Sequence, residues 1–132
     1  MLISLRRIQI ARRAVGNSGA LVLGSLGPQV ESYRPDLIME HDDGVRAYLN
    51  AIAGLHPHVD AYLAETMSCV EEACQAVDAV SRLDAPEKRP ILISLTLNGS
   101  GKVRSGESVV DAIPKLVEYA MDRGVECESV CN

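Results

Sequence analysis

The amino-acid sequence predicts an α/β domain built around a parallel β-sheet. Short apolar runs alternate along the chain with segments in which apolar residues recur at helical spacing. This alternation is typical of βαβ units, whose strands run parallel. The chain has 132 residues, of which 47% are hydrophobic and 23% charged, as expected for one small globular domain. It contains no Phe and no Trp, so aliphatic side chains must build most of the core.

Residues 2–14 are predicted to form a helix, which a Gly-Asn-Ser-Gly breaker ends. Ile8, Ala11 and Val15 would face inward from this helix. The segment is rich in arginine and has no acidic residue before Glu31, which is also typical of a mitochondrial transit peptide. We expect a surface helix in a cytoplasmic protein, and mitochondrial import is the alternative.

Ala20 to Ser25 is a continuous apolar run, which predicts a strand covered on both faces. A loop with two prolines follows over residues 26–40, and a helix begins at Asp42. The residues of this helix that recur at helical spacing are Val45, Leu49, Ile52 and His56.

Val59–Glu65 is predicted to be the second strand. Ser68 is predicted to cap the next helix, because Glu71 lies three residues further on and completes a capping box. The expected buried stripe of this helix comprises Val70, Ala73, Val77 and Val80.

Ile91–Leu97 and Val125–Cys131 are predicted to be the third and fourth strands. Between them we expect a helix over Ser105–Arg123, closed by Gly124. Pro114 inside this helix removes one backbone hydrogen bond and predicts a kink.

The composition argues against several classes of function. A formal net charge of −5 disfavours a nucleic-acid partner, and no apolar run approaches the roughly 20 residues that cross a bilayer. The histidines have no metal-ligand residues at a supporting spacing. The cysteines form no CxxC or zinc-knuckle pattern, and we expect reduced thiols at Cys69, Cys74, Cys127 and Cys131.

Small or polar residues follow each predicted strand. In parallel α/β folds the carboxyl ends of the strands lie at one edge, which is where ligands bind. Glu65 is the carboxylate of this set, and it is either a ligand-binding group or a residue that complements the next helix N-terminus. The segments that meet there are residues 24–28, 65–68 and 98–101, with Asn132.

Four motifs follow one another in register over residues 8–132. The first two are a Gly-Ser-Leu-Gly-Pro turn at 24–28 and a Tyr-Arg stretch at 33–36. The third is a strand at 60–66 that begins with Asp and ends with Glu-Thr. The fourth is Ile93-Ser94-Leu95, followed by Arg-Ser-Gly-Glu at 104–107. In this order and spacing, the motifs resemble those of the homocysteine S-methyltransferase family.

The resemblance implies a (β/α)8 TIM barrel, of which residues 1–132 carry about the third to the sixth strands as one partial domain. In that family, a zinc ion held by three cysteines binds the thiol of homocysteine and lowers its pKa. The thiolate then attacks a methyl group on a sulfonium, ammonium or folate-type donor. The glutamate of the Glu-Thr motif helps to hold the ammonium group of the amino acid, so Glu65 inherits this role. The implied substrate-binding residues are Ser25, Glu65, Thr66, Ser94 and Asn132.

The sequence departs from the family pattern at the zinc ligands. The family's first zinc cysteine follows an Asn that Asn132 matches, and the sequence ends there. The Gly-Gly-Cys-Cys pair of the eighth strand and the Asp-Gly motif of the first are absent. A shifted alignment makes Cys131 a ligand, yet a catalytic zinc site normally takes three protein ligands. We therefore assign no catalytic and no metal-binding residue. We expect this chain alone to bind no zinc and to transfer no methyl group, so homocysteine and a methyl donor are partners of the complete domain.

Two other interpretations stay open. The first is a non-catalytic half-barrel that serves as an assembly or binding module. The second is an unrelated α/β binding protein whose motifs match by coincidence, and it predicts that Ser25 and Glu65 lie apart.

Four strands do not close a barrel, so the outer strands would expose backbone groups and the inner face would lose packing. Several hundred Å² of exposed apolar surface cost on the order of 10 kcal/mol. We therefore expect that this chain is not a stable monomer and that it associates with itself: it should pair two half-barrels, aggregate, or remain partly molten. The inner-face side chains concerned are Leu21, Leu23, Leu63 and Leu92.

Overall fold

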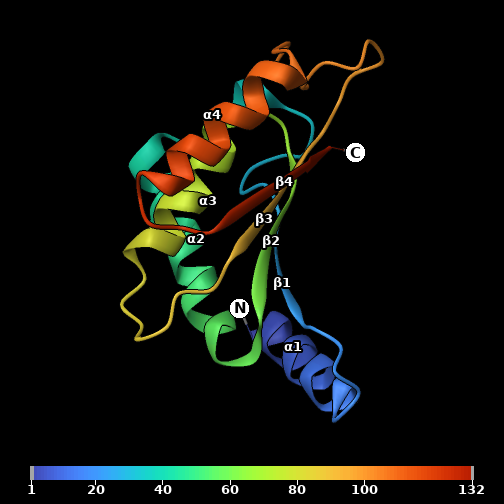
Figure 1. Ribbon diagram of the computed structural model, residues 1–132, viewed down its shortest axis with the longest axis vertical. Helices are drawn as coiled ribbons and strands as arrows, with labels where there is room; N and C mark the ends of the chain where they lie inside the picture. Colours follow the sequence, from blue (N-terminus) through green and yellow to red (C-terminus); the bar gives the residue numbers. More distant parts are fainter. Residues whose placement is uncertain (1, 132) are drawn as a thin grey trace.

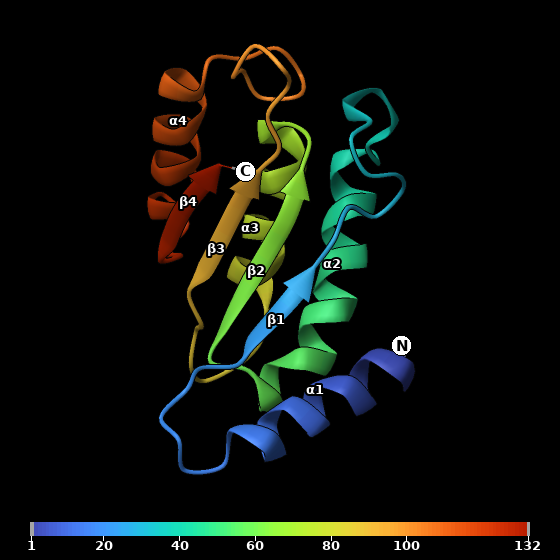
Figure 2. The ribbon, with the colours of Figure 1, turned by 90° about the vertical axis from the view of Figure 1, so that its right-hand side faces the viewer.

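The computed structural model describes residues 2–131, and the side chains of residues 6–128. Within this range the chain forms a four-stranded sheet, wholly parallel, in the order β1-β2-β3-β4. The helices α2, α3 and α4 cover one face of the sheet (Figure 1), and α1 lies across the amino end of β1 (Figure 2). The predicted α/β class is confirmed, and the arrangement is that of a segment of a (β/α)8 barrel. The strands are β1 (Leu23–Leu26), β2 (Ala61–Met67), β3 (Ile91–Leu95) and β4 (Cys127–Cys131), and the helices are α1 (Leu2–Val15), α2 (His41–Leu55), α3 (Val70–Arg82) and α4 (Val109–Met121), with short 3-10 turns at Pro35–Leu37 and His56–His58.

The core lies between the sheet and the α2–α4 layer, and tyrosines take the place of the missing Phe and Trp. Tyr48 and Tyr62 are fully buried. The Tyr48 hydroxyl lies 3.7 Å from Met67 Sδ, and the Tyr62 hydroxyl lies 2.7 Å from His56 Nδ1. Burial raises the pKa of Tyr62 to about 12, so its hydroxyl stays protonated and available for hydrogen bonding.

The first strand differs from its prediction in length and in burial. Val22 and Leu26 are buried, whereas Leu21 is 73% exposed and Leu23 is 39% exposed. The strand is therefore covered on one face only, because within residues 2–131 the helices pack on a single side of the sheet (Figure 2). The ladder begins at Leu23. Just before it, the Val22 carbonyl accepts the Asp60 N–H at 2.8 Å, and the Asp60 carboxylate accepts the Val22 N–H at 2.7 Å.

Asp60 also joins the first helix to the sheet. Arg12 donates to its carboxylate at 2.8 Å and to the His58 carbonyl oxygen at 2.9 Å. The hydrogen bond from the Val22 backbone, followed by that from Arg12, lowers the pKa of Asp60. The predicted surface helix is thus held at the start of β1 and β2, with Ile8 buried against the core.

Other predicted boundaries shift by a few residues. β2 begins and ends two residues later than predicted, and β3 ends at Leu95 because Leu97 pairs antiparallel with Val103. The predicted cap of α3 is wrong by one residue: Cys69 Sγ accepts from the Glu72 N–H at 3.4 Å. The helix predicted from Ser105 begins only at Val109, with Ser108 as its cap. β4 begins two residues later than predicted, at Cys127.

The face of the sheet opposite the helices carries one side chain from every second residue of each strand. Ser25, Leu63, Leu92 and Glu128 are register partners in adjacent parallel strands and share this open face. A hollow of about 340 Å³ lies on the open face near the amino ends of the strands. The hollow is lined by Leu21, Leu23, Ala61, Pro90, Ile91, Leu92, Glu126 and Glu128.

In the part of the chain that the structure describes, no helix is both long and apolar enough to cross a membrane.

Candidate functional site

Ser25 and Glu65 meet on the open face near the carboxyl ends of β1 and β2. Ser25 pairs with Leu63, and Glu65 follows two residues later with its side chain on the same face. The Ser25 hydroxyl donates a hydrogen bond to Glu65 Oε1. The interpretation in which the motifs match by coincidence is therefore wrong on this point, because it requires the two residues to lie apart.

A β-bulge places Thr66 and Ser94 beside this pair. Ala64 pairs with Ile93 and Met67 pairs with Leu95, so Glu65 and Thr66 together face Ser94. Thr66 has a φ of 64°, a left-handed conformation that is rare for a β-branched residue. Such strained positions gather at functional sites, where the surrounding structure holds them.

The remaining predicted residues take different positions. Ser94 is 6% exposed and pairs with Val130 of β4. Asn132 lies outside the described residues. The structure thus brings Ser25, Glu65, Thr66 and Ser94 to neighbouring positions at one end of the sheet.

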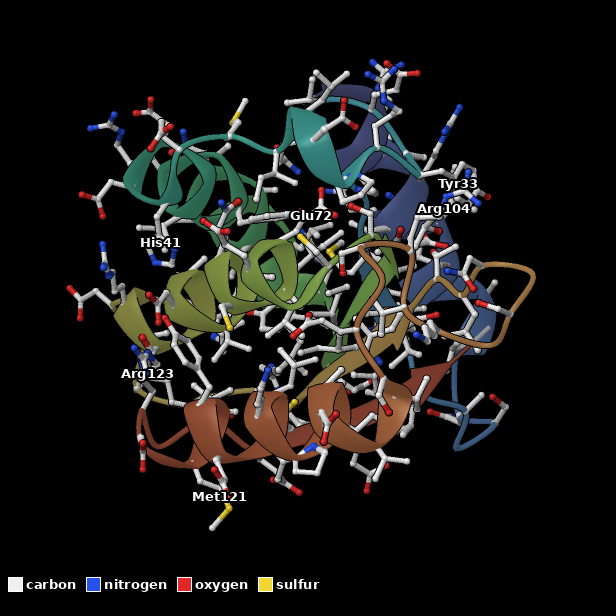
Figure 3. All side chains as sticks on the ribbon, turned by 90° about the horizontal axis from the view of Figure 1, so that it is seen from above. Tyr33, His41, Glu72, Arg104, Met121 and Arg123 are labelled. Carbon is white, nitrogen blue, oxygen red and sulfur yellow. The ribbon has the colours of Figure 1, made fainter. Side chains whose placement is uncertain are left out.

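The loops that follow β1 and β3 meet at the strand ends around β2. Arg104 Nε donates to the Tyr33 carbonyl oxygen at 3.3 Å, and the guanidinium lies 5.8 Å from the centre of the Tyr33 ring. Figure 3 shows this contact from above, on the side away from the helix layer. Tyr33 itself has a φ of 66°. Both segments belong to the family motifs in the sequence, but neither was predicted to be part of the site.

Thr96 was also missed as a site residue. It is 8% exposed, and its hydroxyl is buried with no hydrogen-bond partner within the described residues. Its N–H and C=O are satisfied by Met67 and Arg104, so only the side chain lacks a partner. The i, i+2 spacing from Ser94 was the available sequence pattern for including it.

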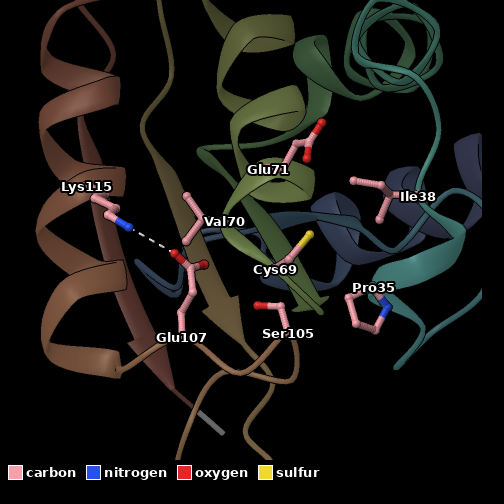
Figure 4. Close-up of a pocket in the computed structure, with 8 residues that line it drawn as sticks. All are labelled: Pro35, Ile38, Cys69, Val70, Glu71, Ser105, Glu107 and Lys115. Atoms are coloured by element: carbon pink, nitrogen blue, oxygen red, sulfur yellow. Dashed lines mark hydrogen bonds and ion pairs between the residues drawn. The ribbon is translucent and has the colours of Figure 1, made fainter.

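A second hollow, of about 450 Å³, lies at the amino end of α3. In Figure 4 the Cys69 thiol and the Ser105 hydroxyl point into it, and Lys115 pairs with Glu107 at one side, at 3.0 Å. Burial raises the pKa of Cys69, which keeps it a neutral thiol rather than a thiolate nucleophile. We therefore place the candidate site at Glu65 and not here.

The described residues do not fit a zinc site. Among the side chains of residues 6–128, no three His, Cys, Asp or Glu residues come close enough to hold a metal ion. Cys74 is buried in the core, and burial raises the pKa of its thiol to about 12. Cys127 shares the helix-side face with its register partner Ile91. The His41 ring is hydrogen-bonded to Asp78, with 2.8 Å between Nε2 and Oδ2.

Comparison with known proteins gives one family. The family model described as homocysteine S-methyltransferase matches residues 2–131 of this chain. Among curated proteins, no match to the chain is found.

Proposed function

This chain belongs to the homocysteine S-methyltransferase family, and we propose that its strand ends around Glu65 bind the amino-acid portion of homocysteine. The observation that carries the proposal is the contact between Ser25 and Glu65 beside the bulge at Thr66. It places a carboxylate and hydroxyl groups at the carboxyl ends of parallel strands, where such folds bind ligands.

In this proposal Glu65 accepts hydrogen bonds from the ammonium group of homocysteine. Ser25 already donates to Glu65 Oε1, which orients the carboxylate and leaves Oε2 for the ligand. Ser94 faces the bulge from β3 and supplies a hydroxyl for the ligand's carboxylate. Asn132 is proposed as a further contact on the family resemblance alone.

Methyl transfer belongs, in our proposal, to the complete family domain with its methyl donor. Zinc, when bound in that family, favours the thiolate form of homocysteine. The described residues of this chain do not fit a zinc site, so we derive no catalytic step for it. Its own residues bind and orient the amino-acid end of the substrate.

The experiment is a titration of the isotopically labelled chain with L-homocysteine, followed by amide NMR shifts. We expect shifts at Ser25, Glu65 and Ser94. Glu65→Gln should weaken binding about 10- to 100-fold, because a hydrogen bond to a charged group contributes about 1.5–3 kcal/mol.

Two controls make the result specific. Glu71→Gln changes a carboxylate that lines the second hollow, and it should leave binding unchanged. The analogue 4-mercaptobutanoate keeps the thiol and the carboxylate but has no ammonium group, so it should bind no better to the natural chain than to Glu65→Gln. Equal affinity of the natural chain and Glu65→Gln for homocysteine would refute the proposal.

The alternative, a non-catalytic module, makes a distinct prediction for the same titration. An assembly module would show no homocysteine-dependent shifts around Glu65 at any concentration tested. A binding module would show them without methyl transfer when zinc and a methyl donor are added.

A further inference from the structure

The two outer strands of the sheet run in the same direction, so either edge could continue a parallel sheet with a second copy. β1 and β4 lie at opposite edges and run parallel to each other. Edge strands present backbone N–H and C=O groups that can pair with another strand. A two-fold axis along the strand direction would therefore bring β4 of one copy beside β1 of the other, at two equivalent junctions.

A hollow of about 340 Å³ runs beside the edge of β1. It is lined by Leu23 and Ser25 of β1, by Arg7, Ile8 and Ala11 of α1, and by Leu55 of α2. The walls are mostly apolar, and Arg7 is the cation among them. The hollow is thus suited to a strand that carries an acidic side chain.

The charges near the two edges are opposite in sign. Arg6, Arg7 and Arg13 are exposed on α1, and none has an ion-pair partner in the described part of the chain. Glu126 and Glu128 are exposed at β4, and their carboxylates likewise form no ion pair among residues 6–128. One chain therefore carries both the basic and the acidic side chains of a possible ion pair, and within the described residues it forms no ion pair between them.

We propose that this chain binds a second copy of itself, with β4 of each copy seated in the hollow beside β1 of the other. Arg7 of one copy then faces Glu128 of the other, at both junctions. The open faces of the two copies turn toward each other and cover Leu21 and Leu23. Because the complementary charges lie on one chain, the second copy is a better-supported occupant than an unrelated protein. The proposal rests on the fold and the charges, and it is independent of homocysteine binding.

The test is sedimentation equilibrium of the full chain at micromolar concentration. We expect one species at twice the 14.2 kDa of a single chain. Arg7→Glu and Glu128→Arg should each raise the dissociation constant at least tenfold, because each places like charges at both junctions. A mixture of these two variants restores opposite charges at both junctions, and it should dimerise as tightly as the natural chain, within about threefold.

Matched variants separate this interface from general effects of charge and apolar exposure. Arg46→Glu reverses a charge on a helix-side residue that is 73% exposed, and it should leave the dimer intact. Leu21→Ser should weaken dimerisation, whereas Val30→Ser, an exposed residue of the β1–α2 loop, should not. A monomer at these concentrations, a polydisperse aggregate, or a mixture of Arg7→Glu and Glu128→Arg that fails to pair would each overturn the proposal.

Discussion

Replacing Asp78 by asparagine is expected to destabilise the fold by about 2–3 kcal/mol. Asp78 lies on α3 with a side chain that is 7% exposed, and it joins α3 to both neighbouring helices. Its carboxylate accepts hydrogen bonds from His41 at 2.8 Å, from Tyr119 at 3.0 Å and from Arg123. His41 and Arg123 flank α3 in Figure 3.

The size of this loss in stability follows from the hydrogen bonds that an asparagine at position 78 could still accept. Arg123 donates to Oδ1, whereas His41 and Tyr119 contact Oδ2. An amide has one oxygen, so its NH2 group must face donors on one side and leave them without an acceptor. Losing one or two charge-assisted bonds costs about 1.5–3 kcal/mol each. The side chains of His41 and Arg123 are about one-third exposed, so water compensates in part and we take the lower end of the summed cost.

The assay is urea unfolding, together with thermal unfolding, of the natural chain and of Asp78→Asn at one protein concentration. Asp36→Asn is the matched control, since Asp36 pairs with Arg34 at a side-chain exposure of 60% and should contribute under about 1 kcal/mol. The melting temperature of Asp78→Asn should fall by on the order of 10 °C. If Asp78→Asn is no less stable than Asp36→Asn, the carboxylate does not stabilise the helix layer as argued.

The same carboxylate gives a pH dependence with a definite sign. Burial acts to raise the pKa of Asp78, but hydrogen bonds from His41, Tyr119 and Arg123 outweigh it, and the net shift is downward. A lowered folded-state pKa contributes stability that is fully present above the unfolded pKa of about 3.9. That contribution is lost as the pH falls below this value through the folded pKa. The stability difference between the natural chain and Asp78→Asn should therefore shrink below about pH 4.

Two further substitutions test the packing around α3 and are measured by the same unfolding assay. Gly44→Ala should cost about 1–3 kcal/mol, because a Cβ there lies 2.0 Å from Gln75 Oε1, and the buried Gln75 is held by its hydrogen bond to the Met39 carbonyl. Gly27→Ala, with nothing within 4 Å, is its control, and equal effects of the two would contradict the packing argument. Glu72→Ala should cost about 2–3 kcal/mol, because Glu72 accepts from both the N–H and the hydroxyl of the buried Ser68. Glu71→Ala, at an exposed neighbouring position, should cost under about 1 kcal/mol, and a larger loss there than at Glu72 would show that Glu72 is not the anchoring carboxylate.

The order and direction of the elements could be predicted because they depend on hydrophobic periodicity, which is local in sequence. The burial of β1 could not. An apolar run such as Ala20–Ser25 is equally consistent with a strand covered on both faces and with one whose second face awaits a partner. Only the position of the helices distinguishes the two, and it shows Leu21 exposed and Val22 buried.

The predicted site residues depended on the family resemblance, and the structure adds what that resemblance does not contain. A bulge has no reliable sequence pattern here, because neither Glu65 nor Thr66 is a glycine. Without it, strict alternation along β2 would put Glu65 on the open face and Thr66 on the helix side. The bulge instead sets both opposite Ser94. Thr96 and the contact between Arg104 and Tyr33 likewise arise from tertiary packing of loops that are distant in sequence.

The open face divides into two parts with different chemistry. Toward the carboxyl ends it carries the polar residues Ser25, Glu65 and Ser94, and toward the amino ends it carries the exposed leucines of β1. The polar part, which we call the rim, can bind a small ligand only if it stays accessible. Covering the leucines, which we call the floor, is favourable because it removes apolar surface from water. Pairing through the edges of β1 and β4 would cover the floor and leave the rim open at the strand ends. The two proposals share Ser25, which contacts Glu65 and also lines the hollow beside β1. Glu65→Gln and Arg7→Glu each change a residue that belongs to one proposal only, so each proposal can fail without the other.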